Sequence, residues 1–242
     1  MIGGKKKRGI HNMNTDVQES FLNNIARKLN RERRSGVTPP RWKNNPLSHF
    51  SNEIDHKSLV EQFIANLHTL HTEVSHIHRS EIGSALQYVV HKFNIQSAVY
   101  WDDDRLHQLE IGKHLIGNFV SHRMWQSKEG ERELRDYAAQ VDMGITYAEM
   151  GLAETGTVVL WNGGGRGRLV SVLPAVYVAI LSEHTIYRRL TEGVTRIHEQ
   201  VSNGLPACIN FITGPSRTGD IEMELAFGVH GPGKVHVILL KD

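Results

Sequence analysis

The 242-residue sequence has a single cysteine, Cys208, and no long run of apolar residues. One thiol excludes an intrachain disulfide, a CxxC metal site and an iron–sulfur cluster held by this chain alone. No segment approaches the roughly 20 consecutive apolar residues of a membrane-spanning helix. The charged first eight residues are not followed by an apolar stretch, which argues against a secretory signal. We therefore expect a protein of a reducing, cytoplasmic compartment without a membrane span.

The net charge of the chain is also small, but basic and acidic residues are distributed unevenly along the sequence. The 28 Lys and Arg residues against 26 Asp and Glu residues give a formal net charge of +2. Residues 1–43 hold 11 basic and 3 acidic residues, a net charge of +8, whereas residues 44–242 hold 17 and 23, a net charge of −6. This asymmetry predicts a basic arm that meets acidic partners, and it argues against a globally basic nucleic-acid-binding surface.

The arm carries the pattern of one short amphipathic helix. Apolar residues recur every four positions, at Val17, Phe21, Ile25 and Leu29. Thr15 and Gln18 form a possible capping box at its start, and the consecutive prolines at 39 and 40 end the pattern. We predict an arm over residues 1–49, consisting of this helix and a proline-containing linker, and one domain over residues 50–242. The narrow apolar stripe favours packing on the body or on a partner over binding to a membrane.

The body alternates helical and strand-like patterns. Helical spacing of apolar residues covers 59–74, 80–93, 105–118, 130–141 and 185–203. Short apolar runs typical of strands cover 97–101, 144–147, 157–161, 176–181, 209–212 and 235–240. Strands that alternate with helices predict an α/β fold, with a layered open sheet flanked by helices.

The first candidate site is Glu154, with Thr155 and Gly156, in a short link between two predicted strands. A four-residue link that ends in glycine is ordinary hairpin chemistry, and spacing alone favours a simple turn. The functional alternative places Glu154 at a sheet edge as a nucleophile or general base.

The second candidate is the glycine-rich run that contains Arg166 and Arg168 and is followed by Ser171. Adjacent glycines let backbone amides approach a ligand, and two arginines can hold a phosphate or carboxylate. The run matches neither GxGxxG nor GxxxxGK[ST], so no nucleotide-binding motif is present. A flexible hairpin tip with solvated arginines explains the pattern equally well.

The third candidate begins where the predicted strand 209–212 runs into a glycine-containing loop. The loop residues are Thr213, Gly214, Pro215 and Ser216, followed by Asp220 and Glu222. A strand, a glycine loop and a helix start would point free amides at an anion. Asp220 could equally be a plain N-cap, and both carboxylates would repel a phosphate. His230 follows in a turn, where a lone histidine is more often structural than catalytic.

Metal and nucleophilic sites have little support in the sequence. Fifteen histidines include a close group, His68, His71, His76 and His78, and the first two would share a helix face. No HExxH or GxSxG motif occurs, so we predict no metal site and no serine nucleophile. Cys208 opens an apolar strand and is expected to be buried and inert.

Several of these segments together resemble a known family. The segments are Ala153–Leu160, Gly165–Arg168, Ser171–Pro174, Phe211–Ser216, Asp220–Glu222 and Gly228–Pro232, with Phe21–Leu29 and Pro40–Trp42 at the front. They resemble the LUD domain, and the chain as a whole is similar to the lactate utilization protein C (LutC/YkgG) family. The glycine run is richer here than in the family pattern.

The resemblance implies a bacterial three-protein system that oxidises L-lactate to pyruvate. Its two other members carry cysteine motifs for iron–sulfur clusters, so this chain would be a cluster-free subunit without a cofactor of its own. The implied fold is similar to NagB/RpiA/CoA transferase-like enzymes. The candidate residues above would then line a cleft for a small carboxylate or another anion, with no catalytic role assigned to any of them.

A rival hypothesis is a stand-alone enzyme for a CoA-activated or phosphorylated small molecule. It rests on the likeness of Glu154–Gly156 to the nucleophilic glutamate turn of CoA-transferases. Three residues are weak evidence, and fold analogy does not fix function.

Overall fold

The computed structural model describes residues 12–34, 36, 38, 43, 54–126, 130–200, 204–219 and 225–241. The chain separates into two compact units, Met1–Asn52 and Glu53–Asp242. Within the described ranges, no helix is long and apolar enough to cross a bilayer.

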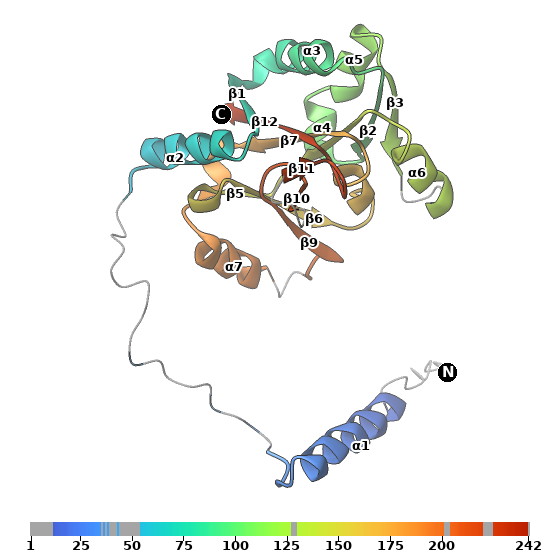
Figure 1. Ribbon diagram of the computed structural model, residues 1–242, viewed down its shortest axis with the longest axis vertical. Helices are drawn as coiled ribbons and strands as arrows, with labels where there is room; N and C mark the ends of the chain where they lie inside the picture. Colours follow the sequence, from blue (N-terminus) through green and yellow to red (C-terminus); the bar gives the residue numbers. More distant parts are fainter. Residues whose placement is uncertain are drawn as a thin grey trace, which may run out of the picture. The chain divides into compact units, whose positions relative to one another are not determined.

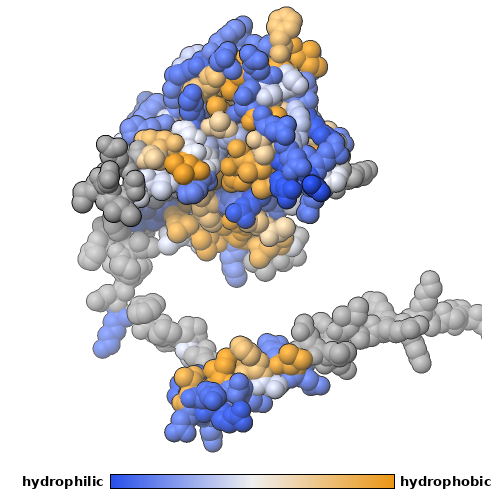
Figure 2. Space-filling model, turned by 45° about the vertical axis from the view of Figure 1, so that its right-hand side comes forward, coloured by the Kyte–Doolittle hydropathy of each residue, from blue (hydrophilic) through white to orange (hydrophobic). Residues whose placement is uncertain are grey.

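The first unit contains α1 (Asn12–Lys28), which confirms the amphipathic helix of the arm. Thr15 lies inside this helix, so the predicted capping box at its start is wrong. The chain turns back after the helix, and Arg33 forms an ion pair with Glu19. The predicted apolar stripe is exposed, from Ile25 at 38% to Val17 at 69%. Figure 2 shows this apolar stripe along one side of α1.

The second unit is built on a six-stranded parallel sheet (Figure 1). Its strands are β1 (Glu73–His78), β2 (Ser97–Trp101), β3 (Ser121–Trp125), β4 (Met143–Tyr147), β7 (Val176–Ser182) and β12 (Lys234–Lys241), in the order β1-β12-β7-β4-β2-β3. Every residue of β4 and β7 is buried, because both faces of a parallel sheet are covered. The predicted α/β architecture is confirmed.

A smaller four-stranded sheet lies next to the first, and all three candidate segments directly adjoin its strands. Its strands are β5 (Met150–Leu152), β6 (Thr157–Asn162), β8 (Ile186–Tyr187) and β9 (Cys208–Ile212), in the order β8-β5-β6-β9. Strands β10 (Arg217–Gly219) and β11 (Leu225–Phe227) form a separate antiparallel pair. Strand β6 is antiparallel to both β5 and β9.

The helices of this unit are shorter than their sequence patterns suggested. They are α2 (His56–Thr69), α3 (Ile82–Phe93), α4 (Asp104–Gln108), α5 (Ile111–Gly117), α6 (Glu131–Ala138) and α7 (Leu190–Glu199), with short 3-10 turns η1 (Arg79–Glu81), η2 (Ala153–Thr155), η3 (Arg168–Ser171) and η4 (Glu183–Thr185). The prediction of a helix to residue 74 is wrong, because α2 ends at Thr69 and Val74 lies in β1. A left-handed Glu110 divides the predicted helix 105–118.

Six of the described strands were missed by the sequence patterns, namely β1, β3, β5, β8, β10 and β11. The four-residue spacing of α2 continues by chance into β1 and concealed it. Strand β3 is a half-buried edge strand with polar residues, and β5 has only three residues. The predicted helix 185–203 was wrong at its start, since Ile186–Tyr187 forms β8.

Candidate functional site

The candidate site lies where β2 and β4 end. In the strand order, β2 leads through α4 and α5 to β3 on one side, and β4 leads to β7 on the other. Neighbouring strands that leave in opposite directions form a topological switch point, and ligands in open α/β sheets bind outside the carboxyl ends of such strands. Asp102 and Asp103 directly follow β2, and Glu149 follows β4. The carboxylates of Asp103 and Glu149 therefore meet at the expected position, where Arg105 contacts both.

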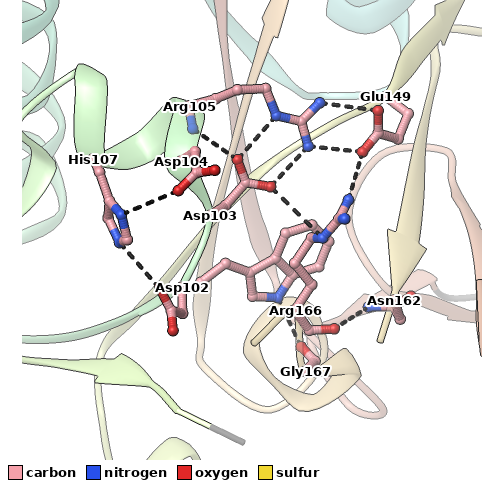
Figure 3. A network of polar contacts seen from close by, with 10 residues as sticks. Asp102, Asp103, Asp104, Arg105, His107, Glu149, Asn162, Arg166 and Gly167 are labelled. Carbon is pink, nitrogen blue, oxygen red and sulfur yellow. Dashed lines mark hydrogen bonds and ion pairs between the residues drawn. The ribbon is translucent and has the colours of Figure 1, made fainter. Parts of the chain in front are cut away.

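Two arginines join the carboxylates of Asp103 and Glu149 into one network (Figure 3). The Arg105 guanidinium donates hydrogen bonds to Asp103 at 2.8–2.9 Å and to both carboxylate oxygens of Glu149 at 2.7 and 2.9 Å. Arg166, from the glycine-rich run, donates to Glu149 at 2.8 Å and lies 3.8 Å from Asp103. The Arg105 guanidinium also stacks 4.4 Å from the centre of the Tyr147 ring. The site thus holds two anions and two cations in mutual contact.

Burial and pairing oppose each other in setting the charge state of this network. Burial alone would raise the pKa of Asp103, but the hydrogen bonds and positive charge of Arg105, with the charge of Arg166, lower it below its usual value. Burial likewise disfavours the charged form of Arg105, and its bonds to Asp103 and Glu149 outweigh this and raise its pKa. Asp103 is therefore an anion at neutral pH and is poorly suited to act as a general base.

A groove of about 460 Å³ opens onto the network. Its lining residues are Asp102, Asp103, Asp104, Arg105, Glu149, Trp161 and Arg166. The four carboxylates exceed the two guanidinium groups, and the carboxylate of Asp102 lies 3.3 Å from His107. The buried Trp161 indole N–H has no partner in the described part of the chain. The excess of negative charge disfavours an anionic ligand. The network therefore acts mainly as a structural connection that holds the ends of β2 and β4 to the glycine-rich run.

The glycine-rich run forms a hairpin with a two-residue loop, Gly164 and Gly165. Two backbone hydrogen bonds between Gly163 and Arg166 close the loop. A Cβ atom on Gly165 would lie 2.6 Å from Asp102, and one on Gly167 would lie 2.1 Å from the Trp125 ring. The Trp101 indole donates to the Gly167 carbonyl at 2.8 Å. The hairpin is thus packed against the body on both flanks, which contradicts a flexible tip.

The two arginines of this run have different surroundings. Arg166 is bound to the network, whereas Arg168 begins η3 and lines a separate groove of about 680 Å³. Ser171 is buried, and its hydroxyl donates to the Arg168 carbonyl at 3.0 Å. Ser171 therefore closes the η3 turn and does not face a ligand.

Glu154 lies in a tight turn between two strands, which is the turn that the sequence spacing favoured. Strands β5 and β6 pair on either side of η2, and Gly156 closes the turn with a left-handed φ of 60°. The Glu154 carboxylate forms a 3.3 Å ion pair with Arg189. Thr155 belongs to a chain of hydroxyl contacts through Thr157 to Thr213, at 2.7 and 2.8 Å. These contacts join the turn to the start of the third candidate.

The third candidate does not lead into a helix, which corrects the predicted strand–loop–helix geometry. After the loop, Arg217–Gly219 forms β10 and pairs with β11. Gly214 takes a left-handed φ of 73° against Leu70, and Pro215 is buried. Ser216 accepts from Gly228 and donates to Pro232 through its backbone. Asp220 and Glu222 lie outside the described residues.

The predicted cleft is therefore divided among different places. The Glu154 turn and Thr213 meet at the start of β6, whereas Arg166 and Arg168 follow its other end. His230 is exposed and lines a third groove, of about 890 Å³, with Asp142. That groove lies at the amino ends of β4 and β7. Among the residues that the structure describes, no single groove is lined by all three candidate segments.

Sequence reasoning missed Asp103, Arg105 and Glu149. The available signal was the run of three aspartates directly after a predicted strand, combined with the switch-point rule for parallel sheets. Glu149 gave no such signal, because only the strand pairing brings it to Arg105.

The histidines of the described ranges differ in their surroundings. In the described part of the chain, no three His, Cys, Asp or Glu side chains are placed to hold one. His71 follows the end of α2, so it does not share a helix face with His68. His76 instead pairs with Glu183 at 2.6 Å. His236 is fully buried in β12, and burial lowers its pKa to about 4. Cys208, which was expected to be buried, is partly exposed.

Comparisons with known proteins connect this architecture to a family. The family model of the LUD domain matches residues 60–240. The chain is 38% identical over 240 residues to lactate utilization protein C of Geobacillus sp. (strain WCH70), covering 96% of this chain and 97% of that one. It is 37% identical over 232 residues to lactate utilization protein C of Bacillus subtilis (strain 168), covering 93% and 96%.

A solved structure supports the fold. The crystal structure of a DUF162 family protein from Deinococcus radiodurans superposes with a TM-score of 0.58 at 19% identity, covering 78% of this chain and all of that one. The resemblance seen in the sequence motifs is confirmed by the family model and the full-length relatives.

Proposed function

This chain belongs to the LUD domain family, and on that premise we propose that it is a cluster-free subunit of a bacterial iron–sulfur system that oxidises L-lactate to pyruvate. The observation that carries the proposal is the full-length match to proteins named lactate utilization protein C. A match that spans the arm as well as the LUD domain supports a shared role more strongly than a match to the domain alone.

The chemistry of the chain supports a division of labour within such a system. Oxidation of L-lactate to pyruvate releases two electrons and two protons. An iron–sulfur cluster usually takes four cysteine ligands, and this chain has one cysteine. The electron carriers would therefore lie in two partner proteins of the cytoplasm, and this chain would bind, orient or assemble.

The arm offers the surface for that assembly. The exposed stripe of α1 includes Phe21 at 63% exposure and is followed by basic residues in the last turn of the helix, Arg27 and Lys28. An amphipathic helix that lies in a groove of a partner buries such a stripe and places its basic residues on an acidic rim. We assign the arm to docking on the partner subunits.

One experiment tests the subunit role. The tagged chain is purified together with the products of the neighbouring genes, and L-lactate oxidation is measured with and without it. We expect oxidation to fall when the chain is left out and to recover when it is added back. Unchanged oxidation in its absence would overturn the proposal.

A second experiment tests the docking role. Phe21→Ser and Ile25→Ser remove apolar side chains from the stripe of α1, and Asn24→Ser is the matched control on the same helix. Loss of copurification in the first two variants alone supports docking through this stripe. Equal copurification in all three would assign assembly to another surface.

A further inference from the structure

The groove beside the glycine-rich hairpin gathers positive charge within an acidic body. It has a volume of about 680 Å³ and lies between the hairpin, α6 and the start of β9. Its basic lining residues are Arg132, Arg135, Arg166 and Arg168, against one acidic residue, Glu131, among the described residues. Residues 44–242 carry a net charge of −6, so this concentration does not follow from composition. Such a groove attracts anions.

The four arginines are not equally engaged. Arg166 is held by Glu149, and Arg132 and Arg135 lie 3.8 and 3.2 Å from Asp136 on the exposed face of α6. The Arg168 side chain has no hydrogen bond or ion pair with any residue in the described ranges. A guanidinium carries five N–H donors and no acceptor, so it requires acceptor oxygens from elsewhere. Solvent water is one source of such oxygens, and a carboxylate or phosphate forms stronger, charge-assisted hydrogen bonds.

The groove also has an apolar part and a rigid rim. Trp125, Leu134, Leu169 and Ala207 line it together with the arginines. The packing of Gly167 on Trp125 fixes the backbone next to Arg168, so the approach of a ligand requires little reordering of the loop. A volume of this size is typical of sites for small organic molecules.

We propose that this groove binds a small organic anion, with its carboxylate or phosphate at Arg168 and its apolar portion against Trp125 and Leu169. The proposal goes beyond the role in lactate oxidation and does not depend on it, because it rests on the lining of the groove. It also separates the anion site from the network at Arg105, where carboxylates predominate.

Cys208 provides a direct probe, because it lines the same groove and is the sole cysteine of the chain. Its reaction rate is measured with a dianionic aromatic disulfide and with an uncharged dipyridyl disulfide, each of which releases a coloured thiol. Removing one nearby positive charge slows the anionic reagent more than the uncharged one, and we expect Arg168→Gln to lower the ratio of the two rates on the order of threefold. Arg168→Lys keeps the charge and should restore the ratio. Arg79→Gln, on η1, is the control outside the groove.

Protection of Cys208 by added ligands then identifies the anion. L-lactate and butyrate test a carboxylate, phenyl phosphate tests an organic phosphate, inorganic phosphate lacks the apolar part, and lactamide lacks the charge. Saturable protection by a carboxylate or by phenyl phosphate, lost in Arg168→Gln, supports the proposal. Protection by inorganic phosphate alone, equal protection by lactamide, or no protection together with an unchanged rate ratio overturns it. Since the wild-type subunit assay is separate, either proposal can fail while the other stands.

Discussion

Two arginines of the glycine-rich run, Arg166 and Arg168, differ in their pairing. Arg166 is bound to Glu149 and lies near Asp103, in a network where every described charge has a partner. Arg168 lines a groove in which no described residue bonds its guanidinium. The neighbouring carboxylates explain the difference. The side chains of Asp103 and Glu149 are only 5% and 18% exposed. Buried anions of this kind are stable only when they are paired, so they hold Arg166, whereas no described carboxylate pairs with Arg168. The same residue type therefore serves the fold at one position and recognition at the other.

The largest effect is expected when the network loses its central cation. Arg105→Met would leave Asp103 and Glu149 partly desolvated and short of donors, since the Asp103 side chain is only 5% exposed. Loss of one partner of a buried ion pair costs about 3 to 5 kcal/mol of unfolding free energy. Urea unfolding measures the loss, and Arg132→Met, at 88% side-chain exposure, is the control. Similar losses in both variants would mean that the network does not stabilise the fold.

A smaller loss is expected when the hairpin is separated from its support. Gly167→Ala places a methyl group against the Trp125 ring, and overpacking of this kind costs about 1 to 3 kcal/mol. Gly164→Ala has the same change at a left-handed glycine with no neighbour within 4 Å, so it tests backbone strain alone. Thermal or urea unfolding should rank Gly167→Ala as the more damaging variant. The reverse order would imply that the hairpin is not packed on Trp125.

The ionised carboxylate of Asp103 should make the free energy of unfolding depend on pH. The pKa of Asp103 is lower in the folded state than its usual value, so the folded state binds fewer protons than the unfolded chain near that pH. Its contribution is then complete above the unfolded pKa and is lost as the pH falls through the folded pKa. The stability gap between wild type and Asp103→Asn should narrow below about pH 4. A gap that stays constant down to pH 3 would contradict the assigned charge state.

The smallest effect is expected from charge removal on the exposed side of the groove. Arg132→Gln should change the unfolding free energy by no more than about 0.5 kcal/mol, as is usual for surface substitutions. It should nevertheless slow the anionic reagent at Cys208, by less than Arg168→Gln does. A stability loss as large as that of Gly167→Ala would place Arg132 in the fold and not in the groove.

The α/β architecture could be predicted from the sequence because the spacing of apolar residues indicates which face of a local helix or strand is buried. Strand 97–101 was placed exactly, and the cores of β4, β6, β7, β9 and β12 were found. Periodicity failed where local pattern and tertiary environment disagree, as at Val74, which continues a helical spacing but pairs in β1.

The candidate site was less accessible to sequence reasoning. The glycine-rich run and its arginines were recognised, but their partners depend on contacts over long sequence separation. Glu149 reaches Arg105 only because β4 lies beside β2, and Trp125 reaches Gly167 only through the packing of the hairpin. No spacing rule encodes such contacts, so the difference in pairing between Arg166 and Arg168 could not be foreseen.

The most direct test of this comparison is the unfolding free energy of Arg166→Gln beside that of Arg168→Gln. Removal of Arg166 takes a charged hydrogen bond from Glu149, and we expect a loss of about 1 kcal/mol or more. Removal of Arg168 breaks no bond within the described residues, and we expect a change within about 0.5 kcal/mol. Equal losses in the two variants, or a larger loss for Arg168→Gln, would contradict the division between a structural and a recognition arginine.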